Sequence, residues 1–438
     1  MINDLNYTCK EICEAVEGEL VGKDILINAL TTNSLEHSGL PYCFFAIKGE
    51  KYNGADYIDD AISKGAKLIV TEEKRPCTVS SIYVKDTVKA LGLLGKKHKG
   101  STRIIGVTGS NGKTTVKDMI ATVLKEKYKI IATNQNENNE IGVAKTLLSI
   151  KDHDYCVVEM GMRGLGEIEW LSYISEPHIS VITNCTNAHI GRLGTEENIF
   201  KAKTEILKYT KKYAVLPNEE RFRQLNNENF KCVYIGENGD YKAENIWKSD
   251  GSLLFDIKGT NCKISSSSTF DSQNAAFAYA VGRLCKIEEG MIKKGLEKWI
   301  KAKGRGELLE INGMKIINDT YNASYESMRC AIEGLAEYKG KGYKTAAVLG
   351  EMLEQGEKAK EFHYKIGELC KCAEIDELLV SGRFSKEYIS GFGKGKEYKT
   401  LDDIVEGIKK ELSESYIVLL KASHAENYGE IINKLREN

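Results

Sequence analysis

A chain of 438 residues is too long for one ordinary hydrophobic core, so its length predicts two or three domains. Its 42% hydrophobic and 29% charged residues are typical of a soluble globular protein. A formal net charge of −1 argues against a general affinity for nucleic acid or anionic membranes. No apolar run approaches the roughly 18 to 20 residues that span a bilayer, which excludes membrane insertion.

The first segment, residues 1–82, predicts a small α/β domain. Strand-like runs at 42–49 and 66–73 flank a helical stretch at 54–66. The N-terminus has early acidic residues and lacks the apolar stretch of a signal peptide. A helix at 87–100 then leads toward the second segment.

Residues 83–300 predict a central domain built on a mostly parallel sheet. Apolar strands are expected at 103–109, 129–133, 154–160, 178–184 and 213–218, with helices at 113–128, 142–150 and 199–210 between them. This alternation is typical of parallel sheets covered by helices on both faces. Residues 301–438 predict a third, Rossmann-like α/β domain, with strands at 314–322, 344–352, 377–382 and 416–423 and helices at 327–338 and 362–372.

Cysteine usage indicates a reducing compartment. The 12 cysteines have no zinc-ribbon spacing, and Cys9/Cys13 and Cys370/Cys372 are the only close pairs. A metal or redox role for Cys9 and Cys13 is an alternative, but small buried thiols in the cytoplasm are the simpler interpretation.

The stretch 106–117, "GVTGSNGKTTVK", is a candidate phosphate-binding loop. A strand precedes it and an amphipathic helix follows it, which is the context that such a loop requires. Backbone amides from Gly109 to Thr114 and the positive end of the helix would converge on phosphates. Lys113 would reach the β- and γ-phosphate oxygens, and the Thr114 hydroxyl would bind Mg²⁺. The strict motif has glycine where this chain has Val107, and the loop alone does not decide between a motor, a switch, a kinase and a carboxylate-activating enzyme.

Two further side chains are candidates for the phosphate site because they lie at or just after the carboxyl ends of predicted strands. Glu159 ends the apolar strand 154–160, at the sheet edge where phosphates bind in such domains. His189 lies in the loop after the strand 178–184, on the same predicted edge.

Six stretches together resemble the Mur ligase family across nearly the whole chain: "TGSNGKTTVKDMI", "TNQNENNEIGV", "VVEMGMRGLGEIEWLS", "VITNCTNAHIGRLGTEENIFKAKTEI", "GRGELLEINGMKIINDTYNA" and "VLGEMLEQGEKAKEFHYKIG". The resemblance implies a three-domain, ATP-dependent amide ligase. Its first domain would bind a UDP-sugar peptide, its second ATP, and its third would complete the site. A substrate carboxylate would take the γ-phosphoryl group, and an amine would then displace phosphate from the acyl phosphate.

The resemblance also implies roles for individual residues. ATP would be bound by Gly109, Asn111, Gly112, Lys113, Thr114, Thr115, Asn274, Arg305 and Asp319. Two Mg²⁺ ions would be held by Thr114, Glu159, His189 and Lys203, and the catalytic residues would be Lys113, His189 and Lys203. By itself Lys203 is an ordinary charged helix residue; the resemblance implies that CO₂ carbamylates it into an anionic ligand. Substrate would contact Ser34, Asn138, Asn139, Tyr321 and Asn322.

The substrate side departs from the family pattern. Where the family carries Asp-Ser-Arg, this chain has Asn33-Ser34-Leu35 in "TTNSLEHSGL". Loss of the arginine removes a two-pronged hydrogen-bond donor. The stretches "MGMRGLGEIE" and "VLGEMLEQGE" are most similar to the branch that adds D-alanyl-D-alanine to UDP-N-acetylmuramoyl-tripeptide. A paralogue that joins another acid to another amine is the alternative.

Three other classes fit less well. A switch or motor would not need Arg305 and Asp319, a folylpolyglutamate synthetase would show pterin-binding motifs in residues 1–100, and an inactive binding module would be expected to lose Lys113, Glu159 or His189. We expect a cytoplasmic monomer that acts on small molecules and binds no nucleic acid.

Overall fold

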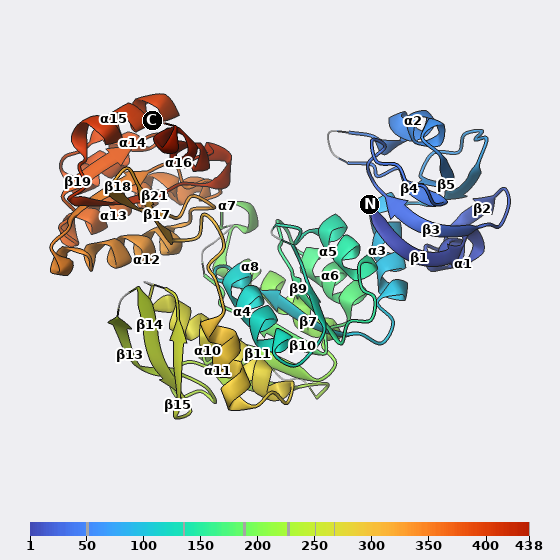
Figure 1. The fold of residues 1–438 in the computed structure, drawn as a ribbon, viewed down its shortest axis with the longest axis horizontal. Helices are drawn as coiled ribbons and strands as arrows, with labels where there is room; N and C mark the ends of the chain where they lie inside the picture. The colour runs from blue at the N-terminus through green and yellow to red at the C-terminus, as the bar shows by residue number, and fades with distance from the viewer. Residues whose placement is uncertain are drawn as a thin grey trace.

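The computed structural model describes residues 1–49, 52–134, 136–186, 190–225, 228–249, 251–266 and 268–437. Figure 1 shows an elongated molecule in which an N-terminal α/β unit, a central α/β unit and a C-terminal α/β unit follow one another, with a small antiparallel sheet beside the C-terminal unit.

The N-terminal unit is a mixed six-stranded sheet in the order β1-β3-β4-β5-β6-β2. Strands β3 to β6 are parallel, and β1 and β2 pair antiparallel at the two edges. Its elements are β1 (Ile2–Thr8), α1 (Cys9–Ala15), β2 (Glu19–Val21), β3 (Leu26–Thr31), β4 (Tyr42–Phe45), η1 (Gly54–Tyr57), α2 (Ile58–Ser63), β5 (Ala66–Thr71) and β6 (Ser80–Tyr83).

Helix α3 (Thr87–His98) joins the N-terminal unit to the central one. Asp86 caps it by accepting a hydrogen bond from the Lys89 amide at 2.9 Å. Its buried Leu91 and Leu94 belong to the N-terminal core, which also includes Ala144 and Leu148 of helix α5 (Glu140–Leu148). One apolar core therefore ties the two units together.

The central sheet has six strands, all parallel, in the order β12-β11-β10-β7-β9-β8, which confirms the prediction of a mostly parallel sheet. Its strands are β7 (Arg103–Thr108), β8 (Ile130–Ala132), β9 (Tyr155–Glu159), β10 (Ile179–Ile182), β11 (Tyr213–Pro217) and β12 (Lys231–Ile235). Its other helices are α4 (Lys113–Lys125), α6 (Glu167–Ser175), α7 (Ile190–Leu193), α8 (Glu196–Thr204), η2 (Glu205–Tyr209), α9 (Glu220–Arg223), α10 (Phe270–Leu284) and α11 (Glu289–Glu297).

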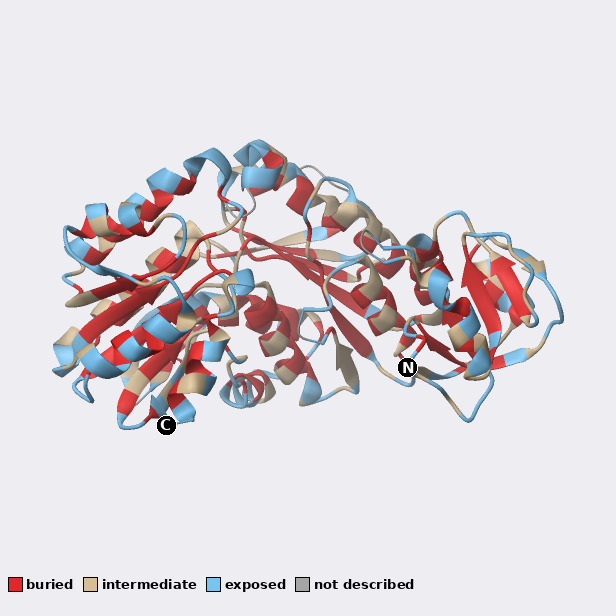
Figure 2. Ribbon diagram, turned by 90° about the horizontal axis from the view of Figure 1, so that it is seen from above, coloured by how far each residue is buried: buried red, intermediate tan, exposed pale blue. Residues whose placement is uncertain are grey.

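Alternate residues of each central strand face opposite layers of helices. Ile105 of β7 packs in the cluster with α4, α10 and α11, whereas its neighbour Ile104 packs in the cluster with α5, α6 and α8. Burial on both faces explains why these strands read as continuous apolar runs. Figure 2 shows the buried strands inside partly exposed helices.

A three-stranded antiparallel sheet, β13 (Ala243–Ser249), β14 (Ser252–Ile257) and β15 (Thr260–Ile264), interrupts the central unit and was not predicted separately. Every second residue of β14 is buried, as expected for a half-buried strand. Lys258 and Gly259 join β14 to β15 with φ of 51° and 79°, the two positive values of a tight hairpin turn.

The C-terminal sheet has the order β16-β17-β21-β18-β19-β20, in which β16 is antiparallel and the others are parallel. This agrees with the predicted α/β third domain. Its elements are β16 (Glu307–Ile311), β17 (Met314–Asn318), α12 (Tyr325–Ala336), η3 (Lys339–Lys341), β18 (Lys344–Leu349), η4 (Gly356–Lys358), α13 (Ala359–Cys372), β19 (Glu377–Val380), α14 (Ser385–Phe392), β20 (Lys396–Glu397), α15 (Leu401–Glu411), β21 (Tyr416–Lys421), η5 (His424–Glu426) and α16 (Gly429–Arg436). Within the described ranges, no helix is long and apolar enough to cross a membrane.

Candidate active site

The predicted phosphate loop connects β7 to α4, and two of its glycines adopt backbone conformations that other residues rarely adopt. Gly109 has φ of 147° and Gly112 has φ of 78°. A Cβ at Gly109 would lie 2.0 Å from Thr183 Oγ1, so this position has no room for a side chain. Gly112 caps α4 without any side-chain hydrogen bond in the described structure, so the amides at the helix start are available to an anion.

The segment after β10 holds the loop in shape. Asn184 Oδ1 accepts a hydrogen bond from the Asn111 amide at 3.0 Å, and Thr183 Oγ1 donates to the Asn111 carbonyl at 2.5 Å. Thr186 Oγ1 accepts from Asn111 Nδ2 at 3.1 Å. Asn184 and Thr186 were not singled out from the sequence, although they stand in the quoted stretch that contains His189. His189 itself lies outside the described residues.

Lys113 folds back over the loop. Its Nζ donates to the carbonyl oxygens of Gly109 at 2.8 Å and Ser110 at 3.0 Å. Burial lowers the pKa of Lys113, and the charge of Arg305 lowers it further while Glu159 opposes the shift. The Lys113 amine is therefore bonded to the loop and feels the charges of a carboxylate of the central unit and an arginine of the C-terminal unit.

Glu159 forms an oxygen-rich cluster with the start of α4. Thr114 Oγ1 donates to Glu159 Oε2 at 2.8 Å, and Asn138 Nδ2 donates to Oε1 at 2.9 Å. Glu159 is only 2% exposed. Hydroxyl and carboxylate oxygens are the ligands that Mg²⁺ prefers, so this pair fits a magnesium ion beside bound phosphates. No three His, Cys, Asp or Glu side chains of the described residues form a metal cluster, so such an ion would depend on phosphate and water oxygens as well.

Lys203 on α8 is fully buried, and its Nζ has no hydrogen-bond partner among the described residues. Burial, together with the nearby charge of Lys113, shifts the pKa of Lys203 well below its usual value. Glu159 and Cys185 exert smaller, opposing effects. The Lys203 amine is therefore buried close to Lys113 and Glu159, in surroundings that disfavour its charged form.

Asn274 on α10 lies against the phosphate loop. A Cβ at Gly112 would be 2.8 Å from Asn274 Oδ1, while Asn274 Nδ2 donates to Asp271 Oδ1 at 3.1 Å. Thr115, in the first turn of α4, is 9% exposed. Gly109, Asn111, Gly112, Lys113, Thr114, Thr115 and Asn274 thus gather at one end of β7.

The C-terminal unit reaches across to this loop through the segment after β17. Tyr321 donates its hydroxyl hydrogen to Asn136 Oδ1 at 2.5 Å, and Ser324 Oγ donates to Asn111 Oδ1 at 3.4 Å. The Arg305 guanidinium stacks 3.7 Å from the centre of the Tyr321 ring. The C-terminal unit therefore places Ser324 against the phosphate loop and Tyr321 against Asn136, with Arg305 stacked on Tyr321. Nucleotide binding by Arg305 stays a prediction, and Asn136 and Ser324 were not among the predicted site residues.

Asp319 is tied to Lys421, a residue that the sequence did not single out. Lys421 Nζ donates to Asp319 Oδ2 at 2.5 Å and to the Asn322 carbonyl at 3.0 Å. Lys421 is 2% exposed, so the ion pair is sheltered. It fixes the backbone between Asp319 and Asn322, next to Tyr321, and the Asn322 side chain remains exposed.

The remaining predicted substrate residues lie on the N-terminal side. Asn139 caps α5 by accepting from the Gly142 amide at 2.9 Å. Ser34 follows β3 in the N-terminal unit, and its carbonyl accepts from Lys64 Nζ at 3.1 Å. No described contact joins Ser34 to the phosphate loop. Its neighbour Leu35 is 73% exposed.

Comparisons with known proteins agree with this architecture. Family models match residues 27–99 (Mur ligase family, catalytic domain), 107–282 (Mur ligase middle domain) and 304–424 (Mur ligase, glutamate ligase domain). The UDP-N-acetylmuramoyl-tripeptide–D-alanyl-D-alanine ligase of Bacillus subtilis (strain 168) is 33% identical over 99% of both chains.

Solved structures lead to the same family. A crystal structure of MurF from Acinetobacter baumannii matches with a TM-score of 0.92 at 27% identity over 99% of both chains. The MurF ligase of Thermotoga maritima in complex with ADP matches with a TM-score of 0.86 at 28% identity, over 93% of this chain and 97% of that one. The chain therefore belongs to the Mur ligase family and is a MurF-like member of it.

Proposed function

We propose that this protein is an ATP-dependent ligase that joins D-alanyl-D-alanine to UDP-N-acetylmuramoyl-tripeptide and releases ADP and phosphate. The full-length likeness to ligases of that name supports the substrates. The observation that carries the reaction class is the contact between units: Tyr321 and Ser324 of the third unit bond Asn136 and Asn111 beside the phosphate loop. A ligase must bring ATP, an acid and an amine into one crevice, whereas a switch needs only the loop.

The proposed reaction has two steps. A carboxylate oxygen of the tripeptide attacks the γ-phosphorus, the bond between that phosphorus and the β,γ-bridging oxygen breaks, and ADP leaves. The amine nitrogen then attacks the acyl carbon, loses a proton, and inorganic phosphate departs as the amide forms. Lys113 and the amides from Gly109 to Thr114 would stabilise negative charge on the transferring group.

Two magnesium ions would neutralise the phosphates and the attacking carboxylate. We assign one to Thr114 and Glu159, whose oxygens already lie together. We assign the second to His189 and Lys203. Magnesium binds oxygen rather than amines, so Lys203 would need to supply an oxygen.

Carbamylation would give Lys203 that oxygen. In its unprotonated form, Nζ would form a bond to the carbon of CO₂ and release a proton, which leaves an anionic carbamate. Two features of the described structure support this step: the amine is fully buried with no hydrogen-bond partner, and its lowered pKa keeps the nitrogen lone pair available.

We assign a role to each domain. Residues 1–82 would bind the UDP-sugar around Ser34, residues 83–300 would bind ATP and present Asn138 and Asn139 to the substrate, and residues 301–438 would add Arg305 and Asp319 to the nucleotide and Tyr321 and Asn322 to the substrate. We also assign the activity to a monomer. All 12 cysteines are free thiols, which supports a reducing, cytoplasmic location.

A second function is favoured by one observation. The exposed Leu35 stands where the family carries an arginine, so the N-terminal domain lacks a charged donor there. A MurF-like paralogue that joins a different acid to a different amine would account for this change.

Phosphate release distinguishes the two functions. Purified protein is incubated with ATP, Mg²⁺, UDP-N-acetylmuramoyl-tripeptide and D-alanyl-D-alanine, and each component is left out in turn. Phosphate release that needs all four supports the first function. Release only with another acid and amine, drawn from a panel of both, supports the paralogue.

A further inference from the structure

The segment Glu351–Gly356, here called the docking loop, follows β18 of the C-terminal unit and contacts α7 of the central unit. The Gly191 amide donates to the Glu354 carbonyl at 3.0 Å, and Arg192 forms an ion pair with Glu354 at 2.8 Å. Leu193 of α7 and Met352 of the loop belong to one buried apolar cluster that continues from the central unit into the C-terminal unit. Backbone, charge and apolar contacts therefore meet at this small interface.

Two glycines allow the backbones to touch. A Cβ at Gly191 would lie 2.5 Å from the Gly356 nitrogen and 2.6 Å from the Glu354 carbonyl oxygen. A Cβ at Gly356 would lie 2.8 Å from Gly191 Cα. The opposing atoms are backbone, which cannot turn aside as a flexible side chain can. A methyl group at position 191 would therefore force the loop and α7 apart.

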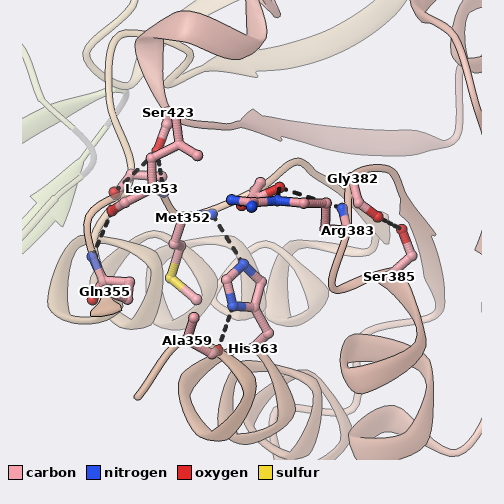
Figure 3. A network of polar contacts seen from close by, with 11 residues as sticks. Met352, Leu353, Gln355, Ala359, His363, Gly382, Arg383, Ser385 and Ser423 are labelled. Atoms are coloured by element: carbon pink, nitrogen blue, oxygen red, sulfur yellow. Dashed lines mark hydrogen bonds and ion pairs between the residues drawn. The ribbon is translucent and has the colours of Figure 1, made fainter. Parts of the chain in front are cut away.

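The docking loop is itself held firmly, as Figure 3 shows. The Met352 amide donates to His363 Nε2 at 3.0 Å, and His363 Nδ1 donates to the Ala359 carbonyl at 2.6 Å. The Leu353 amide donates to Ser423 Oγ at 2.8 Å. At its start, Glu351 pairs with Arg383. Because α13, the segment after β21 and the segment before α14 all hold the loop, its position fixes that of the whole C-terminal sheet.

Two features of the loop cost free energy. Glu354 has φ of 64°, a conformation that a non-glycine residue rarely adopts, and this conformation accompanies its contacts with Gly191 and Arg192. Gln355 Oε1 is buried without a hydrogen-bond partner among the described residues. Strain of this kind collects where a particular shape is needed for function.

We propose that the docking loop positions the C-terminal domain for catalysis, with Gly191 as the positioning residue on the central domain. Helix α8, which carries Lys203, begins three residues after α7 ends. By binding α7, the docking loop would therefore fix the positions of Arg305 and Tyr321 relative to Lys203. This role rests on the proposed ligase function for its kinetic consequence, but the contact itself can be tested without it.

The test compares Gly191→Ala with Gly290→Ala in the full-length protein. Gly290 also lies in the central unit, and a Cβ there meets nothing within 4 Å. Neither position has a positive φ, so both variants should fold. We expect Gly191→Ala to lower kcat by about tenfold or more, because small misplacements of reacting groups are costly. We expect the affinity for ADP, whose phosphates bind the central domain, to match that of Gly290→Ala.

A readout independent of turnover is amide hydrogen exchange of the peptide that contains residues 190–194, because the Gly191 amide bonds Glu354 across the interface. We expect faster exchange in Gly191→Ala than in Gly290→Ala and the wild type. Equal exchange would overturn the docking loop even if the ligase function stands. Faster exchange in a protein that does not ligate the proposed pair would support the loop and refute that function.

Charge reversal provides the rescue. Arg192→Glu should lower kcat by about two- to fivefold, the range for a partly exposed ion pair, and adding Glu354→Arg should restore it. A double variant no better than Arg192→Glu would contradict a positioning role for this pair.

Discussion

Burying an amine without a hydrogen-bond partner costs free energy of folding. Lys203 Nζ, near Lys113 and Glu159, is such an amine among the described residues. If its purpose is to become a carbamate, then Lys203→Ala should lose about a hundredfold or more in kcat, since charge stabilisation at the transferring group is lost. Added formate or acetate should restore part of the rate by placing a carboxylate in the vacated space. Lys201→Ala, on the exposed face of the same helix, is the control. Full activity of unrescued Lys203→Ala would refute the carbamate.

Protein stability should report the same amine. Burial lowers the pKa of Lys203 in the folded protein well below 10.5, so between that lowered pKa and pH 10.5 the unfolded chain binds a proton that the native state lacks. The free energy of unfolding should therefore rise with pH across that window, by up to about 1.4 kcal/mol per pH unit from this one group. Lys203→Met should remove that slope. Urea unfolding in CO₂-free buffer measures it, and parallel curves for wild type and variant would contradict the shifted pKa.

Glu159 makes a separate prediction. Glu159→Gln keeps a side chain that can accept from Asn138 and meet the Thr114 hydroxyl, so folding should be preserved. The metal loses an anionic ligand, and ADP formation should fall by about a thousandfold. Isothermal titration with ADP in EDTA should give the wild-type affinity, since that binding does not use the metal. Near-normal turnover would remove Glu159 from the metal site.

Among the helices and strands, those within local motifs were predictable from the sequence. The phosphate loop, its flanking strand and helix, and the strand-end Glu159 all lie within motifs whose geometry is set by neighbouring residues. Lys421 and Asn136 could not be found in this way, because their partners are Asp319 and Tyr321, which lie far away in the chain. The hairpin at Lys258 and Gly259 has a local signal too, the alternating burial of β14, but it was not predicted from the sequence as a separate sheet.

The phosphate loop itself can be tested by filling the space at Gly109. Gly109→Ala adds a methyl group 2.0 Å from Thr183 Oγ1 at φ of 147°. We expect a loss of about 1–3 kcal/mol in stability and a sharp loss of ADP affinity, because the loop must move. Gly166→Ala is the matched control, since its φ of 86° is also unfavourable but nothing lies within 4 Å. Equal effects of the two substitutions would mean that the close packing on Thr183 is unimportant.

For the whole molecule, the proposed function gives each of the three α/β units a different part of one reaction. The N-terminal unit shares a core with α3 and α5. The C-terminal unit meets the central unit through a few polar contacts at Asn111 and Asn136 and through the docking loop on α7. Such an arrangement suits a third domain that must reach the nucleotide yet release product. The three α/β units and the parallel central sheet were predictable from the sequence. The antiparallel sheet β13–β15 and most of the residues that join the units, such as Asn136 and Glu354, were not.

In the proposed reaction, the acid is activated by direct transfer of the γ-phosphoryl group. The most direct measurement uses UDP-N-acetylmuramoyl-tripeptide with ¹⁸O in its reacting carboxylate, together with ATP and D-alanyl-D-alanine. We expect one ¹⁸O atom per turnover in the released inorganic phosphate, because a carboxylate oxygen becomes the bridging oxygen of the acyl phosphate. Mass spectrometry of the phosphate reads this out. Amide product accompanied by unlabelled phosphate would contradict transfer of the γ-phosphoryl group to the carboxylate.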